Sequence, residues 1–146
     1  MNVSHKLFGA LALSLACSAP ALARDTSVYL PLQAAVDGAR AAGKIDGSVK
    51  FYLAGTGPAG KVVQASVVTN RKTNAAGKSD EEACLWVAQS AVIALHEAAK
   101  TAGANAVTNI VSYYRKNEYR NKTNYECHAG ATVAGVALRG DLSNVK

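Results

Sequence analysis

A glycine-rich segment at residues 55–61 has the spacing of a phosphate-binding P-loop, Gly-x-x-x-x-Gly-Lys. That motif needs a serine or threonine after the lysine to hold Mg²⁺, and a helix whose first N–H groups face the phosphates. Here Val62 follows Lys61, and residues 63–69 have the alternation of a strand. We therefore interpret the segment as a turn and expect no nucleotide cofactor.

Two histidines are the other candidates for site chemistry. His96-Glu97 begins as a zinc-protease helix does, but Lys100 stands where the second histidine of His-Glu-x-x-His belongs. We expect His96 to be a partly exposed helix residue. Cys127 and His128 are adjacent, so a strand directs them to opposite faces. We expect no catalytic residue, no cofactor and no metal site; metal binding through His96 and His128 stays an alternative.

A basic segment that also carries tyrosines is the best candidate for binding. Cations interleaved with aromatic rings can bind nucleic acid or anionic glycans, although a solvated hairpin tip has the same composition. An exported protein rarely meets nucleic acid, so we expect an envelope protein or an anionic envelope glycan or lipid as partner, and no nucleic acid. The candidate contact residues are Arg115, Lys116, Tyr119, Arg120 and Lys122.

Residues 1–23 have the three-part layout of a cleavable signal peptide. Lys6 precedes an uncharged apolar run at residues 7–16, and Ala21-Leu22-Ala23 offers small residues where a signal peptidase reads them. The apolar run is about half the ~20 residues that span a bilayer, so we expect no transmembrane segment after cleavage. The prediction is a periplasmic protein cleaved after Ala23. Lipidation of Cys17 stays open, although Ser14 stands where a lipobox has leucine.

Removal of the signal leaves 123 residues with 15 basic and 10 acidic side chains, a net charge of +5. It also leaves two cysteines, Cys84 and Cys127, which in an oxidising compartment predict one disulfide. Such a bridge closes a loop of about 44 residues and contributes roughly 3–4 kcal/mol in the chain-entropy model. Two buried free thiols are the alternative.

The whole chain has 146 residues, of which 49% are hydrophobic and 18% charged. That composition excludes a disordered chain, and three cysteines are too few for a disulfide scaffold. The length fits one domain, which we place at residues 24–146.

The apolar spacing predicts two helices and four strands. A short helix is expected at residues 31–42, and a long one from Asp80 to about Ala102, with Ser79 and Glu82 as a capping box. Strands at 49–53 and 61–72 should form a hairpin across the glycine-rich turn. Further strands are expected at 106–119 and 125–138. The second should place one face under the long helix, through Cys127, Ala129, Ala131, Val133, Gly135 and Ala137.

The predicted fold class is therefore α+β, in the order α-β-β-α-β-β. We expect a single domain with a four-stranded, largely antiparallel sheet and both helices on one face.

Residues 82–138 carry a resemblance to a known family. An alanine-rich helix ends in Ala-Gly-Ala-Asn-Ala-Val at 102–107, a strand ends in Tyr113-Tyr114, and a cysteine-bearing strand follows with Gly130-Ala131-Thr132 and residues 135–138, Gly-Val-Ala-Leu. This pattern resembles the YbjQ-like domains, often labelled heavy-metal-binding, and the related Rcs outer-membrane stress-sensor lipoproteins. The resemblance implies a compact α/β domain, a bridging cysteine at Cys127 and a role in the envelope stress response.

The chain is also similar to small exported bacterial proteins that carry the name excinuclease ATPase subunit. Its length and the failed P-loop exclude that chemistry. We expect a non-enzymatic exported protein that binds an envelope partner or an anionic ligand. The alternatives are a hydrolase or ligand-sequestering protein with a pocket between helix and sheet, and a metal-binding protein.

Overall fold

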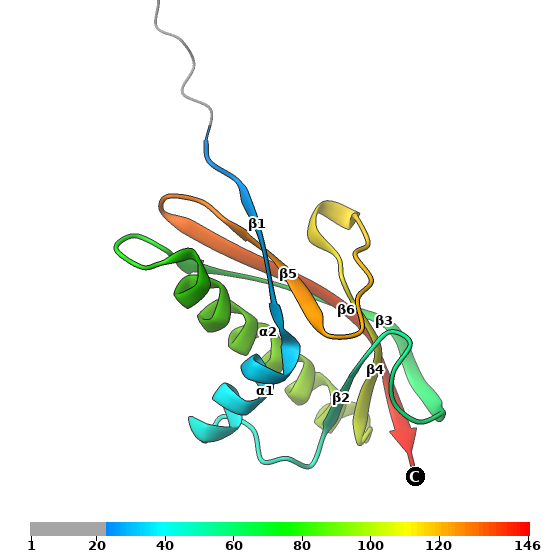
Figure 1. Ribbon diagram of the computed structural model, residues 1–146. Helices are drawn as coiled ribbons and strands as arrows, with labels where there is room; N and C mark the ends of the chain where they lie inside the picture. Colours follow the sequence, from blue (N-terminus) through cyan, green and yellow to red (C-terminus); the bar gives the residue numbers. More distant parts are fainter. Residues whose placement is uncertain (1–22) are drawn as a thin grey trace, which may run out of the picture.

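The computed structural model describes residues 23–146, so Cys17 and all of the predicted signal peptide except Ala23 lie outside the described residues. Figure 1 shows the order of the elements along the chain. They are β1 (Thr26–Pro31), α1 (Leu32–Ala41), β2 (Lys50–Leu53), β3 (Gly60–Asn74), α2 (Asp80–Ala102), β4 (Ala106–Ser112), the 3-10 turn η1 (Tyr114–Lys116), β5 (Asn124–Ala129) and β6 (Val133–Val145).

The long helix α2 has the predicted ends. The Ser79 hydroxyl accepts a hydrogen bond from the Glu82 N–H at 3.1 Å, which caps the first turn as expected. Three acidic residues in that turn favour the positive end of the helix dipole. The helix stops at Gly103, whose φ of +71° is a left-handed conformation that glycine adopts freely.

The sheet is largely antiparallel, as predicted, but has six strands instead of four. β6 lies at its centre and pairs along its length with β3. On its other side, β6 pairs with β4 near its C-terminal end and with β5 near its start. β1 extends the sheet beyond β5, and β2 pairs in parallel with β4. Strand β1 was not predicted from the sequence.

The predicted hairpin between residues 49–53 and 61–72 is wrong. β2 pairs with β4, and β3 pairs with β6, so the two strands leave the glycine-rich turn for different neighbours. The long ladder between β3 and β6 offers far more backbone hydrogen bonds than the four residues of β2 could. The turn itself is confirmed: Gly55 and Gly57 have φ of +78° and +80°, and strand β3 follows instead of a helix.

The two predicted C-terminal strands have wrong limits. β4 ends at Ser112 and not at residue 119, because the chain enters η1, where Arg115 and Lys116 have positive φ. The predicted strand at 125–138 is two strands, β5 and β6, joined by a turn at residues 130–132.

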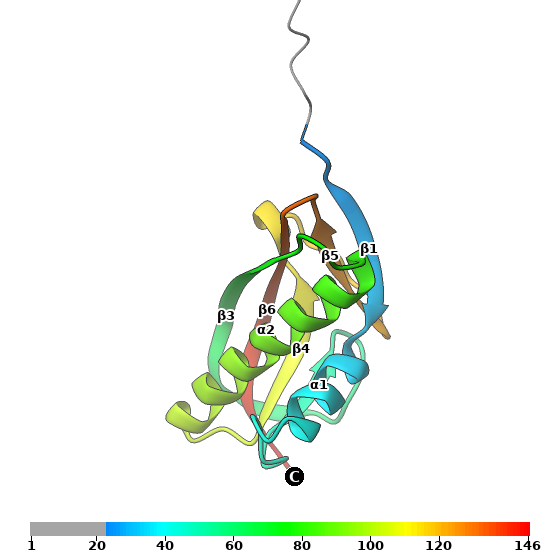
Figure 2. The same cartoon turned by 90° about the vertical axis from the view of Figure 1, so that its left-hand side faces the viewer.

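That turn changes which side chains face the helices. α1 and α2 lie on one face of the sheet (Figure 2), and Cys127 and Ala129 of β5 pack into the core beneath them, as predicted. After the turn, the buried core positions of β6 are Ala134, Val136 and Leu138. The expected core positions at Ala131 and Val133 are exposed, and Gly135 and Ala137 point to the opposite face.

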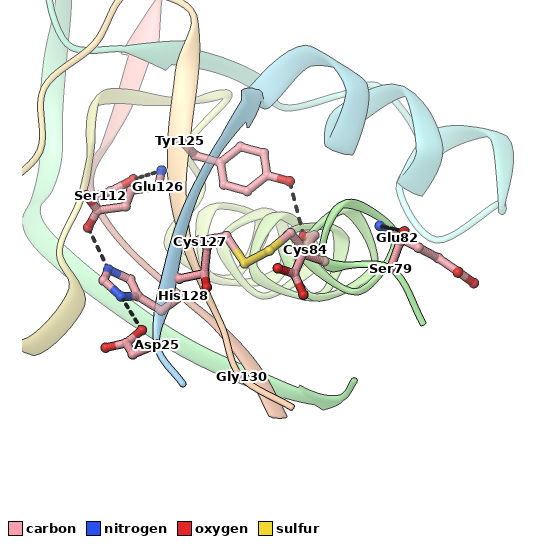
Figure 3. Close-up of a disulfide and its surroundings, with 12 residues drawn as sticks. Asp25, Ser79, Glu82, Cys84, Ser112, Tyr125, Glu126, Cys127, His128 and Gly130 are labelled. Carbon is pink, nitrogen blue, oxygen red and sulfur yellow. Dashed lines mark hydrogen bonds and ion pairs between the residues drawn. A yellow bond between two sulfur atoms is a disulfide. The ribbon is translucent and has the colours of Figure 1, made fainter. Parts of the chain in front are cut away.

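The predicted disulfide is present and joins α2 to β5 (Figure 3). Cys84 and Cys127 are fully buried, with Cα atoms 5.8 Å apart. The hydroxyl of Tyr125, also fully buried, donates a hydrogen bond of 3.1 Å to the Cys84 carbonyl oxygen. Helix and sheet are therefore fixed to each other by a covalent bond and by a buried hydrogen bond beside it.

None of the helices within residues 23–146 combines the length and the apolar character needed to cross a membrane.

Candidate anion-binding cleft

The basic segment between β4 and β5 is not a free hairpin tip. β4 and β5 pair with β6 and not with each other, and the connection folds back on itself through a bridge between Ser112 and Tyr119. Its tyrosines lie on the sheet face opposite the helices. There the Arg139 guanidinium lies 4.5 Å from the centre of the Tyr113 ring, and the Tyr29 and Tyr119 ring centres are 4.9 Å apart.

Beside these tyrosines, the sheet face carries a cleft of about 450 Å³. One wall is the start of the described chain, and the other is η1. β3, β5 and the turn before β6 complete it. The lining residues are Ala23, Arg24, Asp25, Lys72, Tyr114, Arg115, His128, Gly130, Ala131, Thr132, Val133 and Gly135.

Tyr114 and His128 form a rigid wall of this cleft. Their rings are stacked, with centres 3.6 Å apart and planes 12° apart. Nδ1 of His128 lies 2.8 Å from a carboxylate oxygen of Asp25, and Nε2 lies 2.9 Å from one of Glu126 (Figure 3). The Ser112 hydroxyl in turn accepts a hydrogen bond from the Glu126 N–H at 2.8 Å. Because both ring nitrogens are engaged, His128 is fixed in orientation.

Two cations of the cleft are available for a ligand. Arg115 lies over the Tyr114 ring, 5.1 Å from its centre, and Lys72 reaches the cleft from β3. Both are exposed, and within residues 23–146 neither has a carboxylate oxygen within 4.0 Å. Lys72 is paired in register with Gly135, whose missing side chain leaves space between the lysine and Tyr114.

A third cation in the cleft wall, Arg24, is already paired. Its guanidinium makes two hydrogen bonds to the Asp80 carboxylate, of 2.7 and 3.0 Å, and a third of 2.9 Å to the Gly130 carbonyl. The Arg24 guanidinium holds the pKa of Asp80 below its usual range. Arg24 therefore attaches the start of the chain to α2 and to the turn before β6.

The structure does not bring the other predicted contact residues into this cleft. Arg120 pairs with Glu118, which Arg139 also contacts at 2.9 Å, and these cations hold the pKa of Glu118 below its usual range. Tyr119 packs on Tyr29. Lys122 lines a separate surface depression with residues of α1 and β2. Lys116 is exposed beside Arg115 and does not line the cleft.

Lys72, His128 and Gly135 were not predicted from the sequence as neighbours of Arg115. Alternation along β3 could have placed Lys72 on one face, but nothing local predicts that β3 lies next to β6. Gly135 was assigned to the wrong face because the turn at 130–132 was missed.

The expectation that His96 is partly exposed is wrong: it is a buried residue of α2, only 4% exposed. Its Nε2 lies 3.1 Å from a carboxylate oxygen of Asp46, which also binds Lys100 and Ser48. These hydrogen bonds, led by those from Ser48, hold the pKa of Asp46 far below its usual range. The cluster fastens the loop after α1 to α2.

The two histidines are thus in separate clusters. In the described part of the chain, no group of three or more histidine, cysteine, aspartate or glutamate side chains is placed to hold a metal ion.

Comparison with known proteins gives no relative: no family model, curated protein or solved structure matches the chain.

Proposed function

We propose that this chain is an exported, non-enzymatic protein that binds an oxyanion-bearing envelope ligand in the cleft on the back of its sheet. The observation that carries the proposal is the pair Arg115 and Lys72, two cations that line one concave site and have no ion-pair partner within residues 23–146. A guanidinium with a nearby ammonium is a typical receptor for phosphate or carboxylate groups.

The positions of the two cations favour binding over solvation alone. Arg115 has a φ of +51°, a conformation that non-glycine residues adopt rarely, and its guanidinium is held over Tyr114. Tyr114 is itself held by His128. A receptor group that is already oriented loses less entropy when it binds.

Export is supported by the predicted signal peptide and agrees with the buried disulfide. Arg24 and Asp25, the first two residues after the predicted cleavage site, contact Asp80 and His128. Arg24 would be the first residue of the chain after cleavage at Ala23, and it already makes contacts within the folded domain.

Titration of the isotopically labelled chain with sodium sulfate, followed by NMR, tests the proposal. Sulfate keeps one charge state over the working pH range, and constant ionic strength removes general screening. We expect saturable shifts at the amides of Arg115, Lys72 and Gly135. Glucose 1-phosphate and glucuronate then distinguish a phosphoryl from a carboxylate ligand.

A matched pair of variants separates the cleft from the general charge of the protein. Lys72 and Arg71 are neighbours on β3, but only Lys72 lines the cleft. Lys72→Gln should weaken sulfate binding about tenfold, because a charge-assisted hydrogen bond contributes about 1.5–3 kcal/mol. Arg71→Gln removes the same charge and should leave the affinity unchanged. Equal effects of both variants, or shifts spread over the whole surface, would refute the proposal.

A further inference from the structure

The predicted cleavage site lies in the wall of the cleft. Ala23 and Arg24, the residues on either side of the bond, both line it. The Arg24 backbone is packed closely against Gly130, where a Cβ atom would come within 3.1 Å of the Arg24 carbonyl oxygen. Processing of the chain would therefore change the chemistry of the cleft itself.

The position of Arg24 is fixed by contacts on both sides of the chain. Its guanidinium is held by Asp80 and by the Gly130 carbonyl. The next residue, Asp25, accepts from His128, and β1 begins at Thr26, which is paired with Ala129. The backbone nitrogen of Arg24 therefore cannot move far from the cleft.

Cleavage converts that nitrogen from an amide into an amine. Water adds across the Ala23–Arg24 bond: the hydroxyl joins the Ala23 carbonyl, and the proton goes to the Arg24 nitrogen. Ala23 leaves as a carboxylate with the signal peptide. The new α-amino group has an ordinary pKa of about 7.7–8.0, so it is largely an ammonium with three donors at neutral pH.

We propose that signal cleavage completes the binding site, because the α-ammonium of Arg24 becomes a third cation of the cleft beside Arg115 and Lys72. This inference rests on the proposed function, since it concerns the same ligand. It implies that the precursor binds weakly and that the ligand is held at full strength only after export.

The amine would share its surroundings with several charged groups. Asp80 of α2 is occupied by the Arg24 side chain, and Glu126 by His128. Among residues 23–146, the titratable and charged groups that face this end of the cleft are Arg24, Asp25, Lys72, Asp80, Tyr114, Arg115, Glu126 and His128. A chain with an acetylated Arg24 amine keeps all of these side chains, so a comparison with it isolates the contribution of the α-amine.

The test compares three chains that contain every described helix and strand. One begins at Arg24 with a free amine, one begins at Arg24 with an acetylated amine, and one begins at Ala21. Sulfate affinity should be highest in the first and at least about fivefold lower in the other two, since about fivefold is the effect of one unit charge on a single negative charge about 4 Å away in water. Calorimetric titration with sodium sulfate at constant ionic strength measures the difference.

The pH dependence provides a second readout. In the free-amine chain, sulfate affinity should fall as the pH rises through about 8, because the ammonium loses its proton. The acetylated chain should show no such step. Equal affinities and equal pH profiles for the three chains would overturn this inference. If Lys72→Gln still weakens binding in that case, the proposed function stands without it; if Lys72→Gln also has no effect, both fail.

Discussion

The imidazole of His128 stacks on the phenol ring of Tyr114, with ring centres 3.6 Å apart. This pair connects the two ends of the cleft. His128 binds Asp25 at the start of the chain, and Tyr114 lies beneath the guanidinium of Arg115. One stacked pair therefore fixes both the chain start and the candidate ligand-binding arginine.

Because Tyr114 orients Arg115, removing the Tyr114 ring should weaken sulfate binding although the charge of the protein does not change. Tyr114→Ala should lower sulfate affinity about threefold to tenfold, because ordering a freed long side chain costs about 0.5–1.5 kcal/mol. Tyr114→Phe keeps the ring and should bind like the unmodified chain. Calorimetry on the two variants checks this. An unchanged affinity in Tyr114→Ala would show that Arg115 does not depend on the ring.

Filling the base of the cleft should block it. A Cβ atom at Gly135 would make ordinary contacts of 3.6–3.9 Å with Arg71, Lys72 and Tyr114, and its backbone needs no positive φ. Gly135→Val should therefore fold with a similar Tm and lose sulfate affinity about tenfold or more, since its methyl groups occupy the ligand space. Full binding by a folded Gly135→Val would place the ligand elsewhere.

Gly140 on the same strand is the packing control for that experiment. A Cβ atom there would lie 2.7 Å from a methyl carbon of Val107, in a filled part of the sheet. Gly140→Ala should lower the free energy of unfolding by about 1–3 kcal/mol, as overpacking does. Thermal unfolding of the two glycine variants distinguishes an open site from a packed one.

The disulfide should contribute much of the stability. Cys84 and Cys127 are 43 residues apart, so the reduced chain regains the entropy of an open loop of that size. Replacing both with alanine should lower the free energy of unfolding by about 3–4 kcal/mol. Urea unfolding of the oxidised chain and of the double variant measures this. Identical urea midpoints would contradict a structural role for the bridge.

Asp46 should make the protein acid-sensitive. Its pKa is lowered in the folded chain by Ser48, Lys100 and His96, so its stabilising effect is present above its ordinary pKa near 4. That effect is lost as the pH falls towards the lowered value. Asp46→Asn should therefore be less stable than the unmodified chain at pH 5, with the difference narrowing below pH 4. Urea midpoints between pH 2.5 and 5 test this.

The exposed Asp37, which accepts a hydrogen bond from Gln33 on its own helix, is the control for Asp46. Asp37→Asn should leave the midpoints nearly unchanged. A difference between Asp46→Asn and the unmodified chain that stayed constant down to pH 2.5 would contradict the assignment to Asp46.

Local signals explain which parts of the fold the sequence could predict. Ser79 and Gly103 mark the two ends of α2 in the sequence itself. The disulfide could be predicted from the number of cysteines alone, without the strand pairing of the sheet. The pairing of β2 with β4, and of β3 with β6, depends on contacts between distant segments, so adjacency along the chain favoured a false hairpin.

The same limit applies to the cleft. Arg115 was recognisable from its basic surroundings, but Lys72 is 43 positions away along the chain and meets it only because β3 lies beside β6. Residues 125–138 alternate in the sequence as the side chains of a single strand would, so the turn at Gly130 was not predicted. The turn there reverses the faces of everything after it, which is why the position of Gly135 was mispredicted.

The most direct test of the central claim compares Arg115 with its neighbour Lys116. Both are exposed cations with positive φ, of 51° and 63°, so glutamine at either position removes one charge in the same backbone setting. Only Arg115 lines the cleft. Calorimetric titration with sodium sulfate should show about tenfold weaker binding for Arg115→Gln and unchanged binding for Lys116→Gln. Equal affinities in the two variants would contradict binding in this cleft.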